Sequence, residues 1–83
     1  MHERMICVSE LEFIKEFSYN LKDAMREYDI TKEELAEYSG FSQSTISRYL
    51  KGECMPSLKA ICNLCCVFEC EMSDLVPTDD FVL

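Results

Sequence analysis

Glycine and proline are scarce in this chain, with two of each among 83 residues. Because these residues form turns and interrupt helices, their scarcity favours an all-helical chain with short connections. The sequence contains no run of about 18 apolar residues, so it offers no candidate for a membrane-spanning helix. The start of the sequence also lacks a long apolar segment followed by a cleavage site. We therefore expect a cytoplasmic rather than a secreted protein.

The residues that most often carry catalysis are also few. His2 is the single histidine, and the sequence has no Gly-rich phosphate-binding loop and no arrangement of a nucleophile with a base. Adjacent acids, such as Glu33 with Glu34 and Asp79 with Asp80, are typical of solvated charge and helix capping. We therefore expect a protein that is not an enzyme and that needs no cofactor.

Six cysteines are many for a chain of this length. Disulfides usually join segments that are distant in sequence, and nothing in this chain indicates an oxidising compartment. Within an amphipathic helix, by contrast, cysteine acts as a small apolar residue. Four of the six fall within nine residues of one predicted helix: Cys62, Cys65, Cys66 and Cys70.

A capping box and apolar periodicity predict a long first helix. Ser9, followed by Glu12 three residues later, opens it, and we expect it to reach Tyr28 with an interruption near Ser18–Asn20. Its apolar residues recur at steps of three and four: Leu11, Ile14, Phe17, Leu21, Ala24, Met25 and Tyr28.

Similar signals mark the later helices. Thr31 with Glu34 predicts a second capping box, and Ser42 predicts the cap of a helix that ends before Gly52. Pro56–Ser57 opens a fourth helix through about residue 68, and Ser73 is predicted to cap a last turn. The predicted buried stripe of the fourth helix is apolar: Leu58, Ile61, Cys62, Cys65 and Phe68.

Residues 32–51 carry the strongest pattern, since they predict two short helices joined by a tight turn. Leu35 and Ala36 form the inner face of the first helix, and the small Ala36 suits two helices that cross closely. Gly40 follows four residues later, where a sharp turn needs positive φ. The second helix is predicted to pack through Phe41, Ile46 and Tyr49. Its polar residues share the other face: Gln43, Ser44, Ser47, Arg48 and Lys51.

Residues 17–76 resemble the phage-repressor and Xre-type helix-turn-helix family. The matching string is LAEYSGFSQSTISRYLKGECMPSLKAICNLCCVF, which follows the family pattern of Leu-Ala, Gly four residues later, Ser-Gln-Ser-Thr-Ile-Ser, and then Gly and Pro. The resemblance implies an all-α fold, a compact orthogonal bundle of about five helices. It also implies a transcriptional regulator that binds double-stranded DNA, commonly as a two-fold dimer on an inverted repeat. Residues 1–16 then form an N-terminal extension, helical from about residue 9, and residues 77–83 a tail.

The resemblance assigns DNA contacts to particular positions. In the family, the start of the second motif helix enters the major groove, which predicts base contacts from three polar residues: Gln43, Ser44 and Ser47. Lys32 occupies a position that contacts a phosphate, where the helix N-terminus adds free N–H groups. Arg48 and Lys51 are placed to reach the flanking backbone. We expect a homodimer, because a single half-site of this kind would bind weakly.

The family positions also predict which other residues pack. They take apolar residues where Cys62, Cys65 and Cys70 stand, so we favour core packing over zinc for these thiols. A tetrahedral zinc site would need ligands from a second element, where the candidates are few: Cys54, Cys7 and His2. Cys66 falls at a polar surface position and is predicted to be the exposed thiol. Tyr38 and Tyr49 are predicted to pack.

Three positions depart from the family pattern. Met25 stands where an Arg often pairs with the acid at Glu34, and Asp29 replaces a common Gly. Glu53 stands where a Lys or Arg commonly follows Gly52 and meets a phosphate. The change at Glu53 removes an attractive contact with DNA and adds a repulsive one.

The net charge of −8 opposes DNA binding, because neutralisation of phosphates supplies much of the affinity for DNA. Within residues 21–52, however, five Lys and Arg face six Asp and Glu, so the acid excess lies mostly elsewhere. The alternative is an acidic protein-interaction module with the same fold and little DNA affinity. A continuous negative face across Gln43 and Ser47 would favour that alternative. A thiol- or metal-dependent sensor ranks third.

Overall fold

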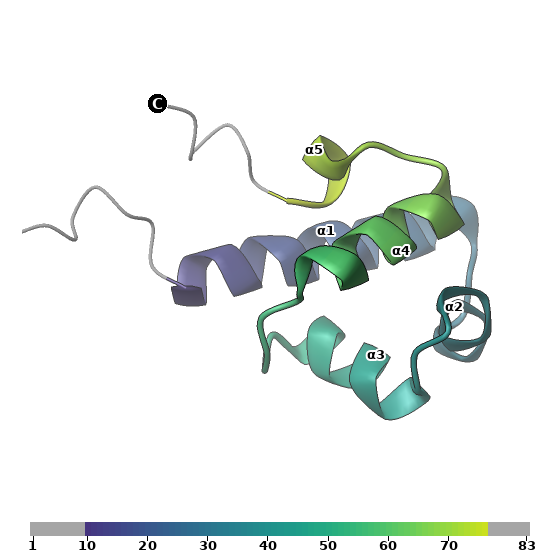
Figure 1. Ribbon diagram of the computed structural model, residues 1–83, viewed down its shortest axis with the longest axis horizontal. Coiled ribbons are helices and arrows are strands. Elements are labelled where there is room, and N and C mark those ends of the chain that lie inside the picture. The colour runs from purple at the N-terminus through teal and green to yellow at the C-terminus, as the bar shows by residue number, and fades with distance from the viewer. Residues whose placement is uncertain (1–9, 77–83) are drawn as a thin grey trace, which may run out of the picture.

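The computed structural model describes residues 10–76, which form a bundle of five helices (Figure 1). They are α1 (Glu10–Tyr28), α2 (Lys32–Ser39), α3 (Gln43–Lys51), α4 (Leu58–Phe68) and α5 (Met72–Leu75). No strand occurs between residues 10 and 76, so the predicted all-α class is confirmed. The capping box expected at Ser9 and the C-terminal tail lie outside the described residues.

Helix α1 is continuous, and the interruption predicted at Ser18–Asn20 was wrong. Both polar residues bond to distant parts of the chain. The Ser18 hydroxyl donates to the Leu50 carbonyl at 2.6 Å. The Asn20 amide donates to the Leu75 carbonyl at 3.0 Å. Because these side chains have partners across the bundle, they do not compete with the backbone of their own helix.

The connection from α1 to α2 depends on a left-handed residue. Asp29 has φ 55°, and the next residue, Ile30, donates its N–H to the Met25 carbonyl at 2.9 Å. Asp is among the few non-glycine residues that tolerate this conformation. The glycine that the resembled family commonly has at this position would meet the same requirement for positive φ.

Helix α2 has the predicted capping box and the predicted glycine end. The Thr31 hydroxyl accepts from the Glu34 N–H at 3.1 Å, and the Glu34 carboxylate accepts from the Thr31 N–H at 3.0 Å. Gly40 ends the helix at φ 85° and donates its N–H to the Ala36 carbonyl. The turn between α2 and α3 is therefore set by local sequence.

A core shared by all five helices holds the bundle together. Helix α1 lies behind α4 in Figure 1, and Tyr28 and Phe68 join them with ring centroids 5.5 Å apart. Below them, the Tyr49 ring meets Phe17 edge-on at 5.7 Å. Burial of each large apolar side chain contributes about 1.5–3 kcal/mol. The fully buried side chains come from every helix: Phe17, Phe68, Leu21, Leu35, Ile46, Leu64 and Leu75.

Several predictions of burial were wrong. Leu58 is 66% exposed and Tyr38 is 60% exposed, and Cys62 is exposed as well. The predicted and observed stripes of α4 share three residues, but the observed stripe is rotated toward Ala60 and Leu64. Because α4 is apolar on both sides, periodicity alone did not fix which side faces inward. The buried residues of α4 are Ala60, Ile61, Leu64, Cys65 and Phe68.

The N-cap of helix α5 lies two residues before the cap predicted at Ser73. Glu71 occupies the cap position, and its N–H donates to the Asp74 carboxylate at 3.1 Å. Ser73 lies inside the helix. The Asp74 carboxylate, three residues after the cap, satisfies the N–H of the cap residue itself. None of the helices between residues 10 and 76 is long and apolar enough to span a bilayer.

Candidate nucleic-acid interface

Local sequence fixes both ends of α3. The Ser42 hydroxyl accepts from the Thr45 N–H at 3.1 Å, as predicted for an N-cap. Gly52 ends the helix at φ 71°, and the N–H of Glu53 donates to the Arg48 carbonyl at 2.9 Å. A side chain at Gly52 would strain this left-handed backbone. The length of α3 is therefore determined by its caps.

Core contacts fix which side of α3 faces outward. Ile46 is fully buried and Tyr49 nearly so. The Phe41 ring meets Tyr49 edge-on, with centroids 6.2 Å apart. The predicted packing of these three residues is confirmed. Helical periodicity then places Ser44, Arg48 and Lys51, at steps of four and three residues, on the outer side.

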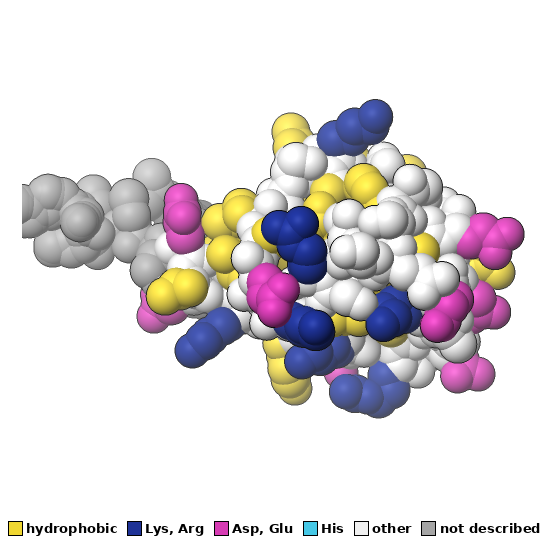
Figure 2. Space-filling view, turned by 90° about the horizontal axis from the view of Figure 1, so that it is seen from below, with side chains coloured by type: hydrophobic (Ala, Val, Ile, Leu, Met, Phe, Trp, Pro, Cys, Tyr) yellow, Lys and Arg dark blue, Asp and Glu magenta, His cyan; other side chains and the backbone are white. Residues whose placement is uncertain are grey.

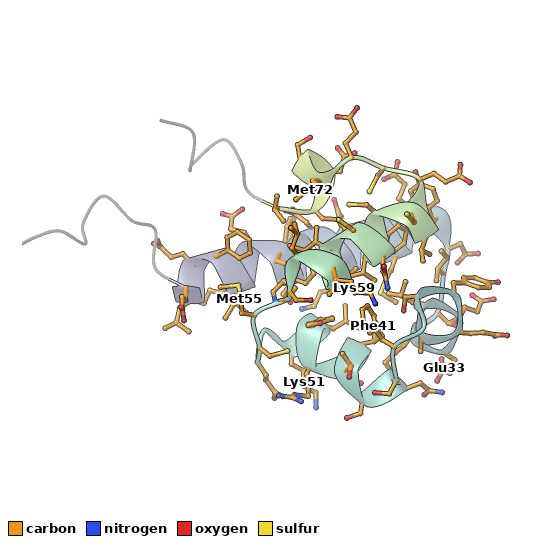
Figure 3. The ribbon with its side chains drawn as sticks, viewed as in Figure 1. Glu33, Phe41, Lys51, Met55, Lys59 and Met72 are labelled. Atoms are coloured by element: carbon orange, nitrogen blue, oxygen red, sulfur yellow. The ribbon has the colours of Figure 1, made fainter. Side chains whose placement is uncertain are left out.

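We define the ridge as six side chains: Gln43, Ser44, Ser47, Arg48 and Lys51 of α3, and Lys32 of α2. Ser47 and Lys32 are half-buried, and the other four are exposed. Lys51 extends outward at the end of α3 (Figure 3). In the part of the chain that the structure describes, no ridge side chain forms a hydrogen bond or an ion pair. These groups are therefore available to a ligand.

The charge around the ridge differs from that of the whole chain. Figure 2 looks at the face below α3 and shows Lys and Arg side chains gathered there. Acidic side chains lie mainly at the ends of this face, with an acid among the cations. None of the sixteen acidic residues lies in α3 itself. The continuous negative face that would favour a protein-interaction module is not present on this side.

Lys32 has a less favourable setting than the cations of α3. It is the first residue of α2, where backbone N–H groups point outward. However, Glu33 and Glu34 follow it in the same turn, and Glu34 engages the Thr31 N–H. A phosphate at this position would therefore meet one cation close to two carboxylates.

Tyr49 supports the ridge from inside. Burial raises the pKa of its phenol, nearby Cys54 raises it further, and Arg48 lowers it in part. The phenol is therefore neutral at physiological pH. It contributes packing under Arg48 without adding negative charge beside the ridge.

The four cysteines between residues 62 and 70 divide into an inner and an outer pair, whereas Cys54 is half-buried beside Tyr49. Cys65 and Cys70 are hydrogen-bonded to each other, and burial raises the pKa of Cys65 to about 12 and also raises the pKa of Cys70. Cys62 and Cys66 are exposed, as predicted for Cys66 alone. Between residues 10 and 76, no group of three or more His, Cys, Asp or Glu side chains is arranged to hold a metal ion.

Sequence reasoning missed the hydrogen bond that joins Ser18 of α1 to the C-terminal end of α3. This serine is buried and its hydroxyl holds the Leu50 carbonyl, which orients the C-terminal end of α3 on α1. The available signal was its position, four residues after Ile14 and three before Leu21, on the apolar side of α1. A polar residue at such a position usually has a buried partner.

The two-helix unit matches a known family. Residues 21–75 match the model of the helix-turn-helix family HTH_3, which is about two thirds of the chain. The chain belongs to this family. Its resemblance to Xre-type sequences is thereby confirmed. A search of curated proteins found no match.

Two solved structures share the fold. One is the restriction-modification controller protein C.AhdI from Aeromonas hydrophila, with a TM-score of 0.72 and 24% identity, covering 75% of this chain and 94% of that chain. The other is an HTH_3 family transcriptional regulator from Vibrio cholerae, with a TM-score of 0.79 and 16% identity. The match covers 88% of this chain and 41% of the Vibrio chain.

Proposed function

We propose that this chain is a sequence-specific DNA-binding transcriptional regulator that places the start of α3 in the major groove. The supporting observation is the ridge: an outward helix face with hydrogen-bonding and cationic groups and no acid, in a chain of net charge −8. The family match supports the same conclusion, because related folds present this helix to base edges.

The proposed contacts follow from the chemistry of each side chain. Gln43, in the first turn of α3, can form a two-point hydrogen bond with adenine, and Ser44 and Ser47 can bond to either base type. Arg48 and Lys51 lie farther along α3, where they would meet phosphates on the flanking backbone. The uncharged groups would then provide specificity and the cations affinity.

We further propose that the functional form is a homodimer on an inverted repeat. Each ridge carries three cations, so two ridges supply six phosphate contacts. The logarithm of affinity should then fall with the logarithm of salt concentration with a slope no steeper than about −5. We therefore expect weak non-specific binding.

The competing function is an acidic protein-interaction module. Its support is the net charge and the exposed acids of α2, which are Glu33, Glu34 and Glu37. A basic partner would bind that surface by charge complementarity. These acids belong to α2 and not to α3, so this function would leave the polar and cationic side chains of α3 unused.

Fluorescence anisotropy with inverted-repeat DNA from the promoter region of its own gene, at low and moderate salt, tests the proposal. Replacing Gln43 and Arg48 by Ala should weaken specific binding by about 1–3 kcal/mol for each base-contacting side chain lost. Lys15→Ala, which removes an exposed cation from α1, is the matched control and should change affinity little. Unchanged affinity in the double variant would refute the assignment of the ridge.

A further inference from the structure

The outer side of α4 is a second surface with little charge, and its one acid is Glu69 at the C-terminal cap. Leu58 is 66% exposed, and Cys62 and Cys66 are exposed one turn apart. Beside Cys66, a hollow of about 370 Å³ is bordered by the exposed Tyr38 of α2. None of the chain's sixteen acids lies in α4, whose single charged residue is Lys59. We call Leu58, Lys59, Cys62, Cys66 and Glu69 the α4 face.

We propose that the α4 face is the surface through which two copies of this chain pair. The two α4 helices would run antiparallel about a two-fold axis that passes between Cys62 and Cys66. This inference deepens the proposed function, which requires a dimer but does not identify its interface. The occupant is a second copy because the charges of this face complement themselves.

The self-complementarity follows from residue positions. The midpoint between Cys62 and Cys66 along the chain is Leu64. Lys59 lies five residues before this midpoint and Glu69 five residues after it. In an antiparallel pair, Lys59 of each copy therefore lies level with Glu69 of the other copy. A parallel pair would place like charges level with each other. Among residues 10–76, neither Lys59 nor Glu69 has a side-chain hydrogen bond or an ion pair.

Net charge restricts where two such chains can meet. Each carries −8, so most surfaces would bring acids against acids. The α4 face avoids this repulsion and adds two opposite-charge pairs. Its small thiol side chains at the centre also permit helix axes to approach to about 8 Å. One helix pair buries less than the roughly 1,200 Å² of a standard interface, so the free dimer should be weak.

The orientation of the helices agrees with DNA binding by both copies. In Figure 1, α4 lies in front of α1, and α3 lies below them. A two-fold axis that is upright in this view and passes in front of α4 places the second copy toward the viewer. It leaves α3 of both copies on the lower side. Two ridges on the same side are what a duplex with two half-sites requires.

Charge reversal tests the interface without DNA. In sedimentation equilibrium at low salt, Glu69→Lys and Lys59→Glu should each weaken dimerisation about tenfold, and the double variant should restore it. The matched control for Glu69→Lys is Glu16→Lys on α1, which changes net charge by the same amount and sign and should not weaken the dimer. Glu69→Lys is decisive, because it lowers overall repulsion and yet should weaken pairing. If it strengthens pairing as much as Glu16→Lys does, or if no dimer forms, the interface is wrong.

Cross-linking tests the register independently. In a background with Cys7, Cys54 and Cys70 replaced by Ser, diamide would oxidise Cys62 of one copy and Cys66 of the other to a disulfide. The two thiols lose two hydrogens, and the diazene is reduced to a hydrazine. Cys62→Ser and Cys66→Ser should each abolish the cross-linked dimer band on a non-reducing gel. A mixture of the two variants should restore the band, because a mixed dimer retains one Cys62 opposite one Cys66. A band from either variant alone would overturn the antiparallel register.

These readouts separate the two proposals. A dimer that cross-links as expected but fails to bind inverted-repeat DNA would support the α4 face and refute the DNA-binding function. A chain that binds DNA through the ridge but keeps its dimerisation in Glu69→Lys would support the function and refute the α4 face.

Discussion

The outer sides of α3 and α4 have one property in common and differ in another. Neither helix contains any of the sixteen acidic residues, although acids occur in α1, α2, α5 and the connections. Beyond that, α3 presents amide, hydroxyl and cationic groups, whereas α4 presents Leu58 and two thiols. Exclusion of acids suits any negatively charged partner, whether a duplex or another copy of this chain. The remaining side chains determine which of the two fits.

The inner and outer sides of α4 can be compared with one substitution made twice. Leu64 is fully buried and Leu58 is 66% exposed. We expect Leu64→Ala to lower the free energy of unfolding by about 2–5 kcal/mol, because it leaves a cavity in the core. Leu58→Ala should change it by no more than about 0.5 kcal/mol. Urea denaturation measures both, and similar losses would contradict the assigned orientation of α4.

The inner thiol of α4 should make stability fall in alkaline solution. Burial raises the pKa of Cys65 to about 12, so above the ordinary thiol pKa the unfolded chain loses this proton and the folded chain keeps it. Stability should therefore decrease between about pH 9 and pH 12, by up to about 1.4 kcal/mol per pH unit from this group. Below that window the group has no effect.

Urea denaturation from pH 7 to pH 11 checks this expectation. Cys65→Ala removes the titrating thiol, so the free energy of unfolding should fall less steeply with rising pH. The substitution also costs some packing energy, but that cost is the same at every pH. A slope unchanged by that substitution would show that other groups cause the decrease.

The acid that borders the ridge should limit DNA affinity. Glu53 is exposed directly after the end of α3. Glu53→Lys should strengthen DNA binding about three- to tenfold at low salt. It should also make the slope of log affinity against log salt concentration steeper by about 1 for each protomer. Anisotropy titrations at several salt concentrations measure both quantities. Glu16→Lys is the control, and an equal gain there would attribute the effect to net charge alone.

The N-caps of α3 and α4 allow the comparison with the smallest expected effect. The Ser42 hydroxyl caps α3 and the Ser57 hydroxyl caps α4, each accepting one N–H at 3.0–3.1 Å. Ser42→Ala and Ser57→Ala should each cost about 1 kcal/mol of stability. Only Ser42→Ala should also weaken DNA binding, because it loosens the turn that carries Gln43. Thermal unfolding and anisotropy distinguish the two outcomes, and equal effects on DNA would contradict the role of α3.

Local signals predicted the parts of the fold that depend on neighbouring residues. The capping box at Thr31, the cap at Ser42 and the left-handed glycines Gly40 and Gly52 are all as expected. Each of these features is settled within a few residues of the chain, so single-sequence reasoning reaches them. The six ridge residues were predicted from family positions, and their role in DNA contact stays a prediction.

Features that depend on the whole bundle were missed. The continuity of α1 depends on the partners of Ser18 and Asn20, which lie 32 and 55 residues away in sequence. The inward side of α4 depends on how its two apolar sides pack against the other helices of the bundle. The α4 face went unnoticed because Leu58 and Cys62 were assigned to the interior.

If α3 contacts bases as proposed, the hydrogen bond from Ser18 to the Leu50 carbonyl gives the protein an indirect route to altered operator preference. This bond anchors the C-terminal end of α3, the helix that we propose contacts bases, to α1. Loss of the hydroxyl would let α3 pivot slightly about its packed side chains. Gln43 would then address a neighbouring position without itself being replaced. Under the proposed function, selection for a new target sequence could thus act on a residue outside the ridge.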